Sequence, residues 1–322
     1  MLEGLLASIP ALVLLLFGGG VLLWSAERLV EKAEHLATTL SVPKAVVGAI
    51  VLGFGTSLPE LLVCLSFIFD GDTSSAVANA VGSNIANVGV VLGGAALIAP
   101  VTVDRGMLRM ELPLGFGAAT ILLAWAAFFS LITWTVGAVF LVAFAGFLYV
   151  SVARTKRHRK DSLPPDVADR RVLSDSIWIA LALTGVAVGA ELFTHGASGL
   201  ASMLGVPNEV IGLSVVAFGT SLPEVVTTFS AARHGHPELA VGNIAGSNVF
   251  NLMFVLGICT FVAPLELTDA MRRFDFWALV IASLLTLPWL FRARVIGRLQ
   301  GFVMVALYVG FQAFRYLEGR IG

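Results

Sequence analysis

Charged residues are scarce in this sequence. Asp, Glu, Lys and Arg make up only 13% of its 322 residues, about half of the ~25% that is usual in a globular domain. The 20 basic and 21 acidic residues give a net charge of −1, which offers no basic face for binding phosphate groups. These shortages exclude a soluble enzyme, a disordered chain and a nucleic-acid-binding protein.

Cysteine and an N-terminal basic segment are the next absences. The two cysteines, Cys64 and Cys259, both lie within apolar stretches, so we expect them to pack in the core rather than form a disulfide bond. The first basic residue is Arg28. Because no positive segment precedes the first apolar stretch, we expect that stretch to be a membrane helix and not a cleavable signal peptide.

Apolar residues are abundant instead. They make up 57% of the chain, and its mean hydropathy is +0.92. In water such a chain would expose large adhesive patches, so membrane lipid is the expected surrounding. A spanning helix needs roughly 20 mostly apolar residues. Ten stretches meet this requirement: 4–26, 45–69, 73–103, 112–153 split into two near Ser130, 176–208, 210–232, 239–265, 276–291 and 299–314.

A single hydrophilic segment divides the chain. We predict an all-α polytopic membrane protein with ten transmembrane helices: a five-helix repeat over 1–153, a basic loop over 154–172 and a second five-helix repeat over 173–322. With the N-terminus outside, 16 of the 20 Lys and Arg residues fall on the side of the basic loop. Positive residues favour the cytoplasmic side. We therefore expect a prokaryotic cytoplasmic membrane protein with both termini outside and a cytoplasmic central loop.

The two halves contain the same motifs at a constant spacing. Gly-Thr-Ser-Leu-Pro-Glu ends at Glu60 and again at Glu224, and the separation of these two glutamates is called the repeat spacing below. Gly-Ser-Asn-x-x-Asn occurs at 82–87 and, one repeat spacing later, at 246–251. Because each half has an odd number of crossings, the second half must enter the membrane from the opposite side. Such inverted-topology repeats are typical of secondary transporters. The repeated segments as a whole are 47–87 and 211–251.

Each repeated motif contains a helix breaker beside a carboxylate. The proline in Leu-Pro-Glu has no N–H and clashes with the preceding turn, so we expect broken helices at the centre, with freed carbonyls over 53–56 and 217–220. Glu60 and Glu224 lie within stretches that contain no other charge, where an ionised carboxylate needs a partner. Since every Lys and Arg lies in a connection or a tail, that partner is a mobile cation or a proton.

The possible ligands around these two glutamates are all oxygen atoms. They are the carboxylates, the freed carbonyls, and the side chains of Thr56, Ser57, Ser83, Asn87, Thr220, Ser221, Ser247 and Asn251. Neither motif contains His or Cys, which disfavours Zn²⁺ and copper. Hard oxygen ligands suit Ca²⁺ or Na⁺. Two glutamates neutralise either one Ca²⁺ or two monovalent cations, and competition for the same carboxylates is the physical basis of exchange.

The paired motifs resemble the α-repeats of the cation/Ca²⁺ antiporter superfamily, and most of all its prokaryotic Na⁺/Ca²⁺ exchanger branch. The resemblance implies a Ca²⁺ site made by Glu60, Glu224 and the backbone carbonyls of Thr56 and Thr220. It also implies flanking Na⁺ sites, which comprise Ser57, Ser83 and the Gly53 carbonyl on one side, and Ser221, Ser247, the Thr220 hydroxyl and the Ala217 carbonyl on the other. Asn87 and Asn251 would line the middle.

The resemblance also bears on charge and movement. Some prokaryotic members have Asp at the position of Asn251. With Asn there, the fixed charge of the site is −2. A cycle that exchanges three Na⁺ for one Ca²⁺ would then move net charge. The helices that carry the site would form a fixed core, across which the first and sixth helices slide. Glu27 and Glu191 lie on those two helices, as interfacial carboxylates or as gate contacts. We expect His195 to be packed and hydrogen-bonded, and His35, His158, His234 and His236 to be solvated.

We therefore predict a secondary antiporter, not an enzyme, that expels Ca²⁺ with the inward Na⁺ gradient. We expect no prosthetic group, no protein partner and function as a monomer. A Ca²⁺/H⁺ antiporter that uses the same two glutamates is the alternative, since carboxylates without fixed partners also carry protons; the neighbouring hydroxyls favour Na⁺. An ion channel needs no inverted repeat. An intramembrane aspartyl protease needs two aspartates in the membrane, whereas Asp104, Asp161 and Asp275 lie at ends or in loops.

Overall fold

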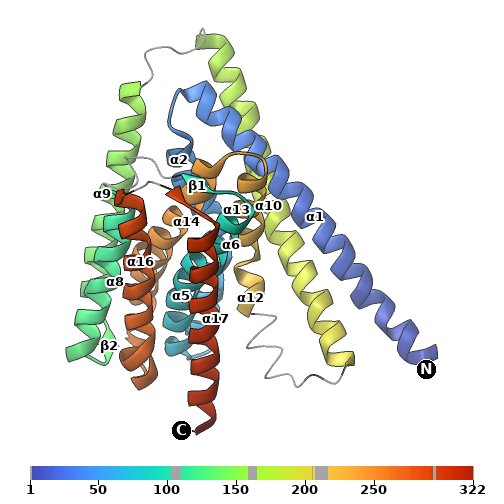
Figure 1. Ribbon diagram of the computed structural model, residues 1–322, viewed down its shortest axis with the longest axis vertical. Coiled ribbons are helices and arrows are strands. Elements are labelled where there is room, and N and C mark those ends of the chain that lie inside the picture. Colours follow the sequence, from blue (N-terminus) through green and yellow to red (C-terminus); the bar gives the residue numbers. More distant parts are fainter. Residues whose placement is uncertain are drawn as a thin grey trace.

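The computed structural model describes residues 2–102, 110–158, 165–204, 206, 217–292 and 295–321. Two long helices, α1 (Leu2–Leu40) and α10 (Pro165–Met203), lie side by side and lean away from the other helices (Figure 1). Their backbones approach closely, since a Cβ added at Gly189 would lie 2.5 Å from the backbone nitrogen of Leu22. Small residues permit such contact between membrane helices.

The helical rods that carry the repeated motifs are broken. In the first half they consist of α2 (Lys44–Val47), η1 (Gly48–Leu52), α3 (Gly53–Thr56) and α4 (Leu58–Phe69), then α5 (Thr73–Ala86), η2 (Asn87–Leu92) and α6 (Gly93–Ile98). In the second half they consist of α12 (Ala217–Thr220) and α13 (Leu222–Arg233), then α14 (Pro237–Val249), η5 (Phe250–Val255) and α15 (Leu256–Val262). The η segments are π-helical, a rare form that is frequent at functional sites.

The remaining elements complete the bundle and connect its halves. The helices are α8 (Glu111–Phe128), α9 (Trp134–His158), η6 (Met271–Asp275), α16 (Phe276–Arg292) and α17 (Arg298–Ile321). The strands are β1 (Val101–Thr102), β2 (Leu131–Ile132), β3 (Leu265–Glu266) and β4 (Val295–Ile296). β1 pairs antiparallel with β4, with Val101 opposite Ile296, and β2 pairs with β3, with Leu131 opposite Glu266. Each pair therefore joins the first half of the chain to the second.

The repeat spacing of the motifs also holds for the elements of the structure. α4 and α13 begin at Leu58 and Leu222, and each has 12 residues. The turns that follow them contain Gly71 and Gly235, with φ values of +84° and +79°, where a side chain would be strained. The starts of β1 and β3, and likewise those of β2 and β4, are separated by the same spacing. Among the described residues, these elements therefore recur in the same order in both halves.

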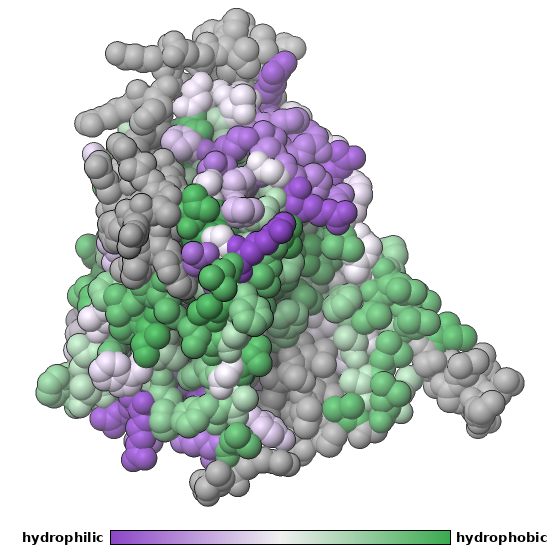
Figure 2. Space-filling model, in the orientation of Figure 1, coloured by the Kyte–Doolittle hydropathy of each residue, from purple (hydrophilic) through white to green (hydrophobic). Residues whose placement is uncertain are grey.

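The described helices have the character of a membrane protein. Figure 2 shows an apolar band across the middle of one face, with hydrophilic side chains near its two ends. Seven described segments are long and apolar enough to cross a membrane: Ile9–Leu40, Lys44–Phe69, Thr73–Ile98, Glu111–Phe128, Trp134–Ala153, Arg171–Met203 and Pro237–Val262. The other expected crossings, 210–232, 276–291 and 299–314, correspond to α13, α16 and α17, and residues 210–216 lie outside the described part. Ten crossings therefore stay a prediction.

Two expected boundaries can be compared with helix ends. The split expected near Ser130 falls between α8 and α9, which end and begin at Phe128 and Trp134. The segment 154–172, expected to be a loop, is partly helical, because α9 continues to His158 and α10 begins at Pro165. Lys and Arg are good helix formers, so these helices continue beyond their apolar stretches. Residues 159–164 lie outside the described part of the chain.

The rod of α14, η5 and α15 runs through the interior and is the most buried of the seven candidate spans. The first half packs directly on its backbone. A Cβ added at Gly48 would lie 2.7 Å from the carbonyl oxygen of Leu239, and one at Gly53 would lie 2.6 Å from the backbone nitrogen of Ser247. The first copy of the broken-helix motif therefore meets the second half in the middle of the bundle.

Candidate functional site

Two serines mark the breaks that position the glutamates. Ser57 (φ −92°, ψ 7°) separates α3 from α4, and Ser221 (φ −89°, ψ 1°) separates α12 from α13. A proline follows each break at the start of the helix, where its missing N–H costs no helical hydrogen bond. Glu60 and Glu224 therefore lie in the first turns of α4 and α13, where the helix dipole stabilises negative charge.

Both glutamate side chains are completely buried, with 0% exposed. Oε1 of Glu224 accepts a 2.7 Å hydrogen bond from the Ser57 hydroxyl and lies 3.5 Å from the Ser247 hydroxyl. Its Oε2, and both carboxylate oxygens of Glu60, have no hydrogen-bond partner among the described residues. Nor does the described chain contain a cluster of three or more His, Cys, Asp or Glu side chains that suits a metal. The site thus combines two carboxylates with neutral oxygen groups.

Hydroxyl groups connect the two copies of the motif. Oγ of Ser247 lies 3.2 Å from the carbonyl oxygen of Gly53, to which it donates, and 3.4 Å from the hydroxyl of Thr56. Thr56 also donates to the carbonyl of Leu52 at 3.0 Å. Because Gly53 has no side chain, its carbonyl and the Ser247 hydroxyl can approach each other. The break in the first half is thereby held against α14 of the second half.

The two asparagines expected in the middle of the site lie in π-helical segments. Asn87 is the first residue of η2, and Asn251 is the second residue of η5. Both side chains are 0% exposed. Asn87 donates a 3.0 Å hydrogen bond through Nδ2 to Oδ1 of Asn248. In the described part of the chain, Oδ1 of Asn87 and both amide atoms of Asn251 have no partner.

The predicted site residues are partly brought together. Direct contacts join Glu224, Ser57, Ser247, Thr56 and Gly53. Glu60, Asn87 and Asn251 are buried without a hydrogen bond to another predicted site residue. Ser83 and Ser221 are also buried, with 7% and 5% exposed. Thr220 and Ala217 are the last and first residues of α12.

Sequence reasoning missed a second layer of polar contacts. Asn79 donates to Sγ of Cys64 at 3.4 Å, and Asn243 donates to Oγ1 of Thr228 at 2.9 Å. The two donors are one repeat spacing apart, and so are the two acceptors, so this contact repeats. The two asparagines lie inside the repeated segments, which was the available signal. The acceptor is a cysteine in the first half and a threonine in the second, so a comparison of the two halves did not reveal it. Cys64 and Cys259 are free and buried, as predicted.

One histidine that we expected to be solvated is instead part of an ion cluster. His236, in the turn between α13 and α14, has a side chain only 16% exposed. Its Nε2 lies 2.9 Å from Oε2 of Glu34, and its Nδ1 lies 3.1 Å from Nζ of Lys44. Burial lowers the pKa of His236 and outweighs the opposing effect of Glu34. The prediction for His236 was wrong because α1 covers this turn.

The histidine expected to be packed is exposed. The His195 side chain is 67% exposed, and its Nδ1 lies 3.1 Å from the carbonyl oxygen and 3.2 Å from Oε1 of Glu191. It is therefore hydrogen-bonded, as predicted, but on its own helix. Glu27 is likewise exposed on α1.

Broken helices that bury two carboxylates inside a helical membrane protein are typical of the secondary transporters, whose ion sites lie at such breaks. A family model described as "Sodium/calcium exchanger protein" matches residues 10–153 and 175–317. The chain therefore belongs to the sodium/calcium exchanger family, a group of cation/Ca²⁺ antiporters.

Individual relatives extend this similarity over nearly the whole chain. CaxA of Alkalimonas amylolytica is 33% identical over 314 residues, covering 94% of this chain and 97% of CaxA. The sodium/calcium exchanger MaX1 of Methanosarcina acetivorans is 29% identical over 337 residues, covering 93% of this chain and 96% of MaX1. A solved structure of the sodium-calcium exchanger NCX_Mj is 31% identical, covers 95% of this chain and 99% of that chain, and gives a TM-score of 0.83. The predicted family is confirmed.

Proposed function

We propose that the chain exports Ca²⁺ in exchange for Na⁺ by alternating access, and that the two ions share the carboxylates of Glu60 and Glu224. The observation that carries this proposal is the state of those carboxylates. Both are fully buried, and three of their four oxygens have no hydrogen-bond partner in the described chain. A buried charge without a partner is strongly disfavoured. A bound cation supplies the missing interaction.

The proposed ligands follow the repeated motifs. Ca²⁺ accepts six to eight oxygen ligands in flexible geometry, which suits two carboxylates supplemented by backbone carbonyls. The proposed Ca²⁺ ligands are Glu60, Glu224 and the carbonyls of Thr56 and Thr220. The proposed Na⁺ ligands are Ser57, Ser83 and the Gly53 carbonyl in one site, and Ser221, Ser247, the Thr220 hydroxyl and the Ala217 carbonyl in the other, with Asn87 and Asn251 between them.

Alternating access is proposed to arise from two inverted five-helix repeats, 1–153 and 173–322. α1 and α10 form a separate layer against the bundle (Figure 1), and their interface contains closely approaching backbones, since a Cβ added at Gly18 would lie 2.5 Å from the backbone nitrogen of Phe193. Because the two helices pack this closely on each other, we propose that they slide across the bundle together, as one unit. We place both termini outside and the basic segment in the cytoplasm, in a prokaryotic cytoplasmic membrane, with the monomer as the transporting unit.

The hydroxyl contacts favour Na⁺ over H⁺ as the coupling ion. A proton on a carboxylate needs one acceptor, whereas Na⁺ needs several oxygen ligands. The Ser57 hydroxyl contacts Glu224 at 2.7 Å, and the Ser247 hydroxyl lies within 3.5 Å of Glu224 and 3.2 Å of the Gly53 carbonyl. Oxygen groups from both proposed Na⁺ sites therefore meet near Glu224, which suits a cation with several oxygen ligands better than a proton.

Transport by the purified chain tests the proposal. Proteoliposomes loaded with Na⁺ and diluted into Na⁺-free medium should take up ⁴⁵Ca²⁺, and an ionophore that dissipates the Na⁺ gradient should stop this uptake. Uptake that is absent with a Na⁺ gradient but present with a pH step in Na⁺-free medium would establish the Ca²⁺/H⁺ antiporter instead. Single-channel currents across a planar bilayer would indicate a channel.

A further inference from the structure

One asparagine of the repeated motif has no role in the proposed site, yet it contacts a residue that does. Asn248 is the third residue of Gly-Ser-Asn-x-x-Asn in the second half. Its Oδ1 accepts the 3.0 Å hydrogen bond from Nδ2 of Asn87. This bond crosses from η2 of the first half to α14 of the second half.

The bond determines which amide atom Asn87 can offer to a third group. A carboxamide carries its donor nitrogen and its acceptor oxygen on opposite branches. With Nδ2 of Asn87 bonded to Asn248, the oxygen is the atom left over. That oxygen is buried and has no partner among the described residues. A cation binds an amide through oxygen and is repelled by the N–H₂ group, so the orientation of Asn87 matters for cation binding.

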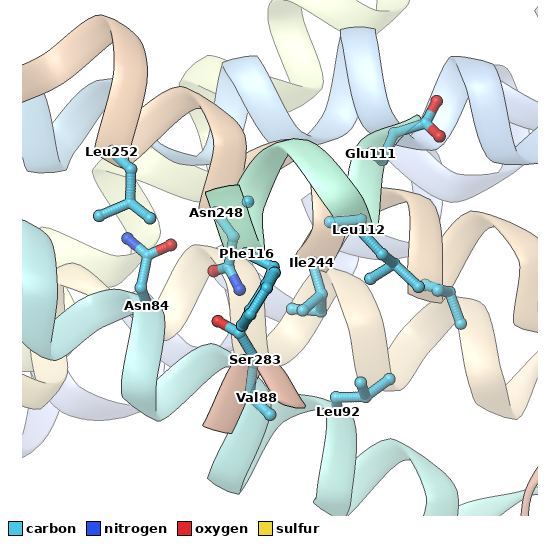
Figure 3. A pocket seen from close by; sticks show the side chains of 13 residues that line it. Asn84, Val88, Leu92, Glu111, Leu112, Phe116, Ile244, Asn248, Leu252 and Ser283 are labelled. Carbon is cyan, nitrogen blue, oxygen red and sulfur yellow. The ribbon is translucent and has the colours of Figure 1, made fainter. Parts of the chain in front are cut away.

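Asn248 is held at the edge of a small cavity. The cavity has a volume of about 30 Å³, and Asn84, Asn248 and Ser283 supply polar groups to its lining (Figure 3). The carboxylate of Glu111, which also lines it, points away from these side chains in Figure 3. This volume is enough for a water molecule. Asn248 therefore contacts Asn87 on one side and borders a cavity large enough for a water molecule on the other.

The equivalent residue of the first half does not act in the same way. Asn84 lies one repeat spacing before Asn248, is 1% exposed, and donates to the carbonyl of Ala80 on its own helix at 2.7 Å. Its oxygen has no partner in the described chain, and Asn251, the equivalent of Asn87, has none at either amide atom. One of the two central asparagines is thus oriented by a neighbour, and the other is not.

We propose that Asn248 is a positioning residue, which holds Asn87 with its carbonyl oxygen available to the transported cation. The inference rests on the proposed function, because it requires a cation to bind beside Asn87. Asn248 acts through Asn87 and does not itself bind the ion.

A double-mutant cycle on Ca²⁺ binding tests this role. ⁴⁵Ca²⁺ binding to the purified full chain in detergent is measured for wild type, Asn248→Ala, Asn87→Ala and the double variant. We expect Asn248→Ala to weaken binding about tenfold, as for the loss of one hydrogen bond to a ligand group. In the Asn87→Ala background the same change should have less than a twofold effect, because the residue through which Asn248 acts is gone. Equal effects in both backgrounds would overturn the proposal.

Two further variants separate positioning from folding. Asn84→Ala changes the equivalent buried amide and should weaken binding less than twofold. Asn248→Asp keeps an acceptor opposite Nδ2 of Asn87 and should bind Ca²⁺ at least as well as wild type; an Asp variant as weak as the Ala variant contradicts the acceptor role. If wild type does not bind ⁴⁵Ca²⁺, the proposed function fails together with this inference. If wild type binds and the cycle is additive, the inference alone fails.

Discussion

Ser57 of the first repeat donates a 2.7 Å hydrogen bond to Glu224 of the second repeat. The reciprocal bond, from Ser221 to Glu60, is missing, because neither carboxylate oxygen of Glu60 has a partner among the described residues. Two identical sequence motifs therefore provide unequal surroundings for their glutamates. Glu60 has both oxygens available to an ion, whereas Glu224 shares one of its oxygens with a hydroxyl.

Removing the Ser57 hydroxyl should show this inequality. A hydrogen bond to a charged group contributes about 1.5–3 kcal/mol, and each 1.4 kcal/mol is about tenfold in affinity. Since both serines are proposed Na⁺ ligands and only Ser57 also holds a glutamate, we expect Ser57→Ala to raise the internal Na⁺ concentration for half-maximal ⁴⁵Ca²⁺ uptake about tenfold or more, and Ser221→Ala to raise it less. Concentration series in Na⁺-loaded proteoliposomes measure both values. Equal shifts, or a larger shift for Ser221→Ala, would contradict the asymmetry.

Much of the architecture could be predicted from the constant spacing of the repeated motifs. Placing Glu60 and Glu224 at helix breaks required only the Leu-Pro-Glu motif, and the structure has breaks at Ser57 and Ser221. The family assignment followed from the same motifs and is confirmed. A proline or a glycine restricts or widens the backbone angles at its own position, so the helix breaks that it causes can be predicted directly from the sequence.

The contacts between the halves could not be predicted in this way. The pairing of β1 with β4 and of β2 with β3 joins segments far apart in the sequence, and two-residue strands have no periodic signal. Because the two motifs have the same sequence, the repeat predicts the same hydrogen bonds for Glu60 and Glu224. Their unequal bonding depends on side-chain positions that the repeated sequence does not specify. The burial of His236 depends on α1 lying over its turn, which local polarity does not reveal.

The two glutamates should be indispensable for transport. Glu60→Gln and Glu224→Gln keep the side-chain size and remove the negative charge. Leaving a buried cation without one of its counter-charges costs about 3–5 kcal/mol, which corresponds to about a hundredfold or more in affinity. We expect no measurable Na⁺-driven ⁴⁵Ca²⁺ uptake from either variant.

The control for this experiment is Asp70→Asn, which removes an exposed carboxylate from the turn after α4. It should retain wild-type uptake. Size-exclusion chromatography in detergent checks that each variant is folded. Wild-type uptake by either glutamine variant would remove that glutamate from the site.

The contact of α14 with the first half should be intolerant of added volume. A Cβ at Gly246 would overlap the carbonyl oxygen of Ala49, whereas a Cβ at Gly20 on α1 meets no atom within 4 Å. Overpacking of this kind costs about 1–3 kcal/mol. We expect Gly246→Ala to lower the melting temperature in detergent and Gly20→Ala to leave it unchanged or to raise it. Identical melting temperatures for the two variants would show that the interface can relax.

The ion cluster at His236 should make stability depend on pH. Lys44 donates to Nδ1 and Nε2 faces Glu34, so the neutral imidazole fits and a proton on Nδ1 would face the Lys44 ammonium. Burial lowers the pKa of His236 below its ordinary value of 6.5. The imidazole therefore binds a proton near pH 6.5 in the unfolded chain, but only at a lower pH in the folded chain. Stability from this group therefore rises with pH through the interval below 6.5 and falls on acidification.

His236→Gln replaces the titratable imidazole with a polar side chain that does not titrate. We expect acidification from pH 7.5 to 5.5 to lower the melting temperature of wild type more than that of His236→Gln, with Glu34, Lys44, His234 and Glu238 retained in both proteins. Taking the difference between the two proteins cancels titration by groups they share. Thermal unfolding in detergent, followed by circular dichroism, measures it. A drop that is equal in both, or larger in the variant, would show that folding does not lower the pKa of His236.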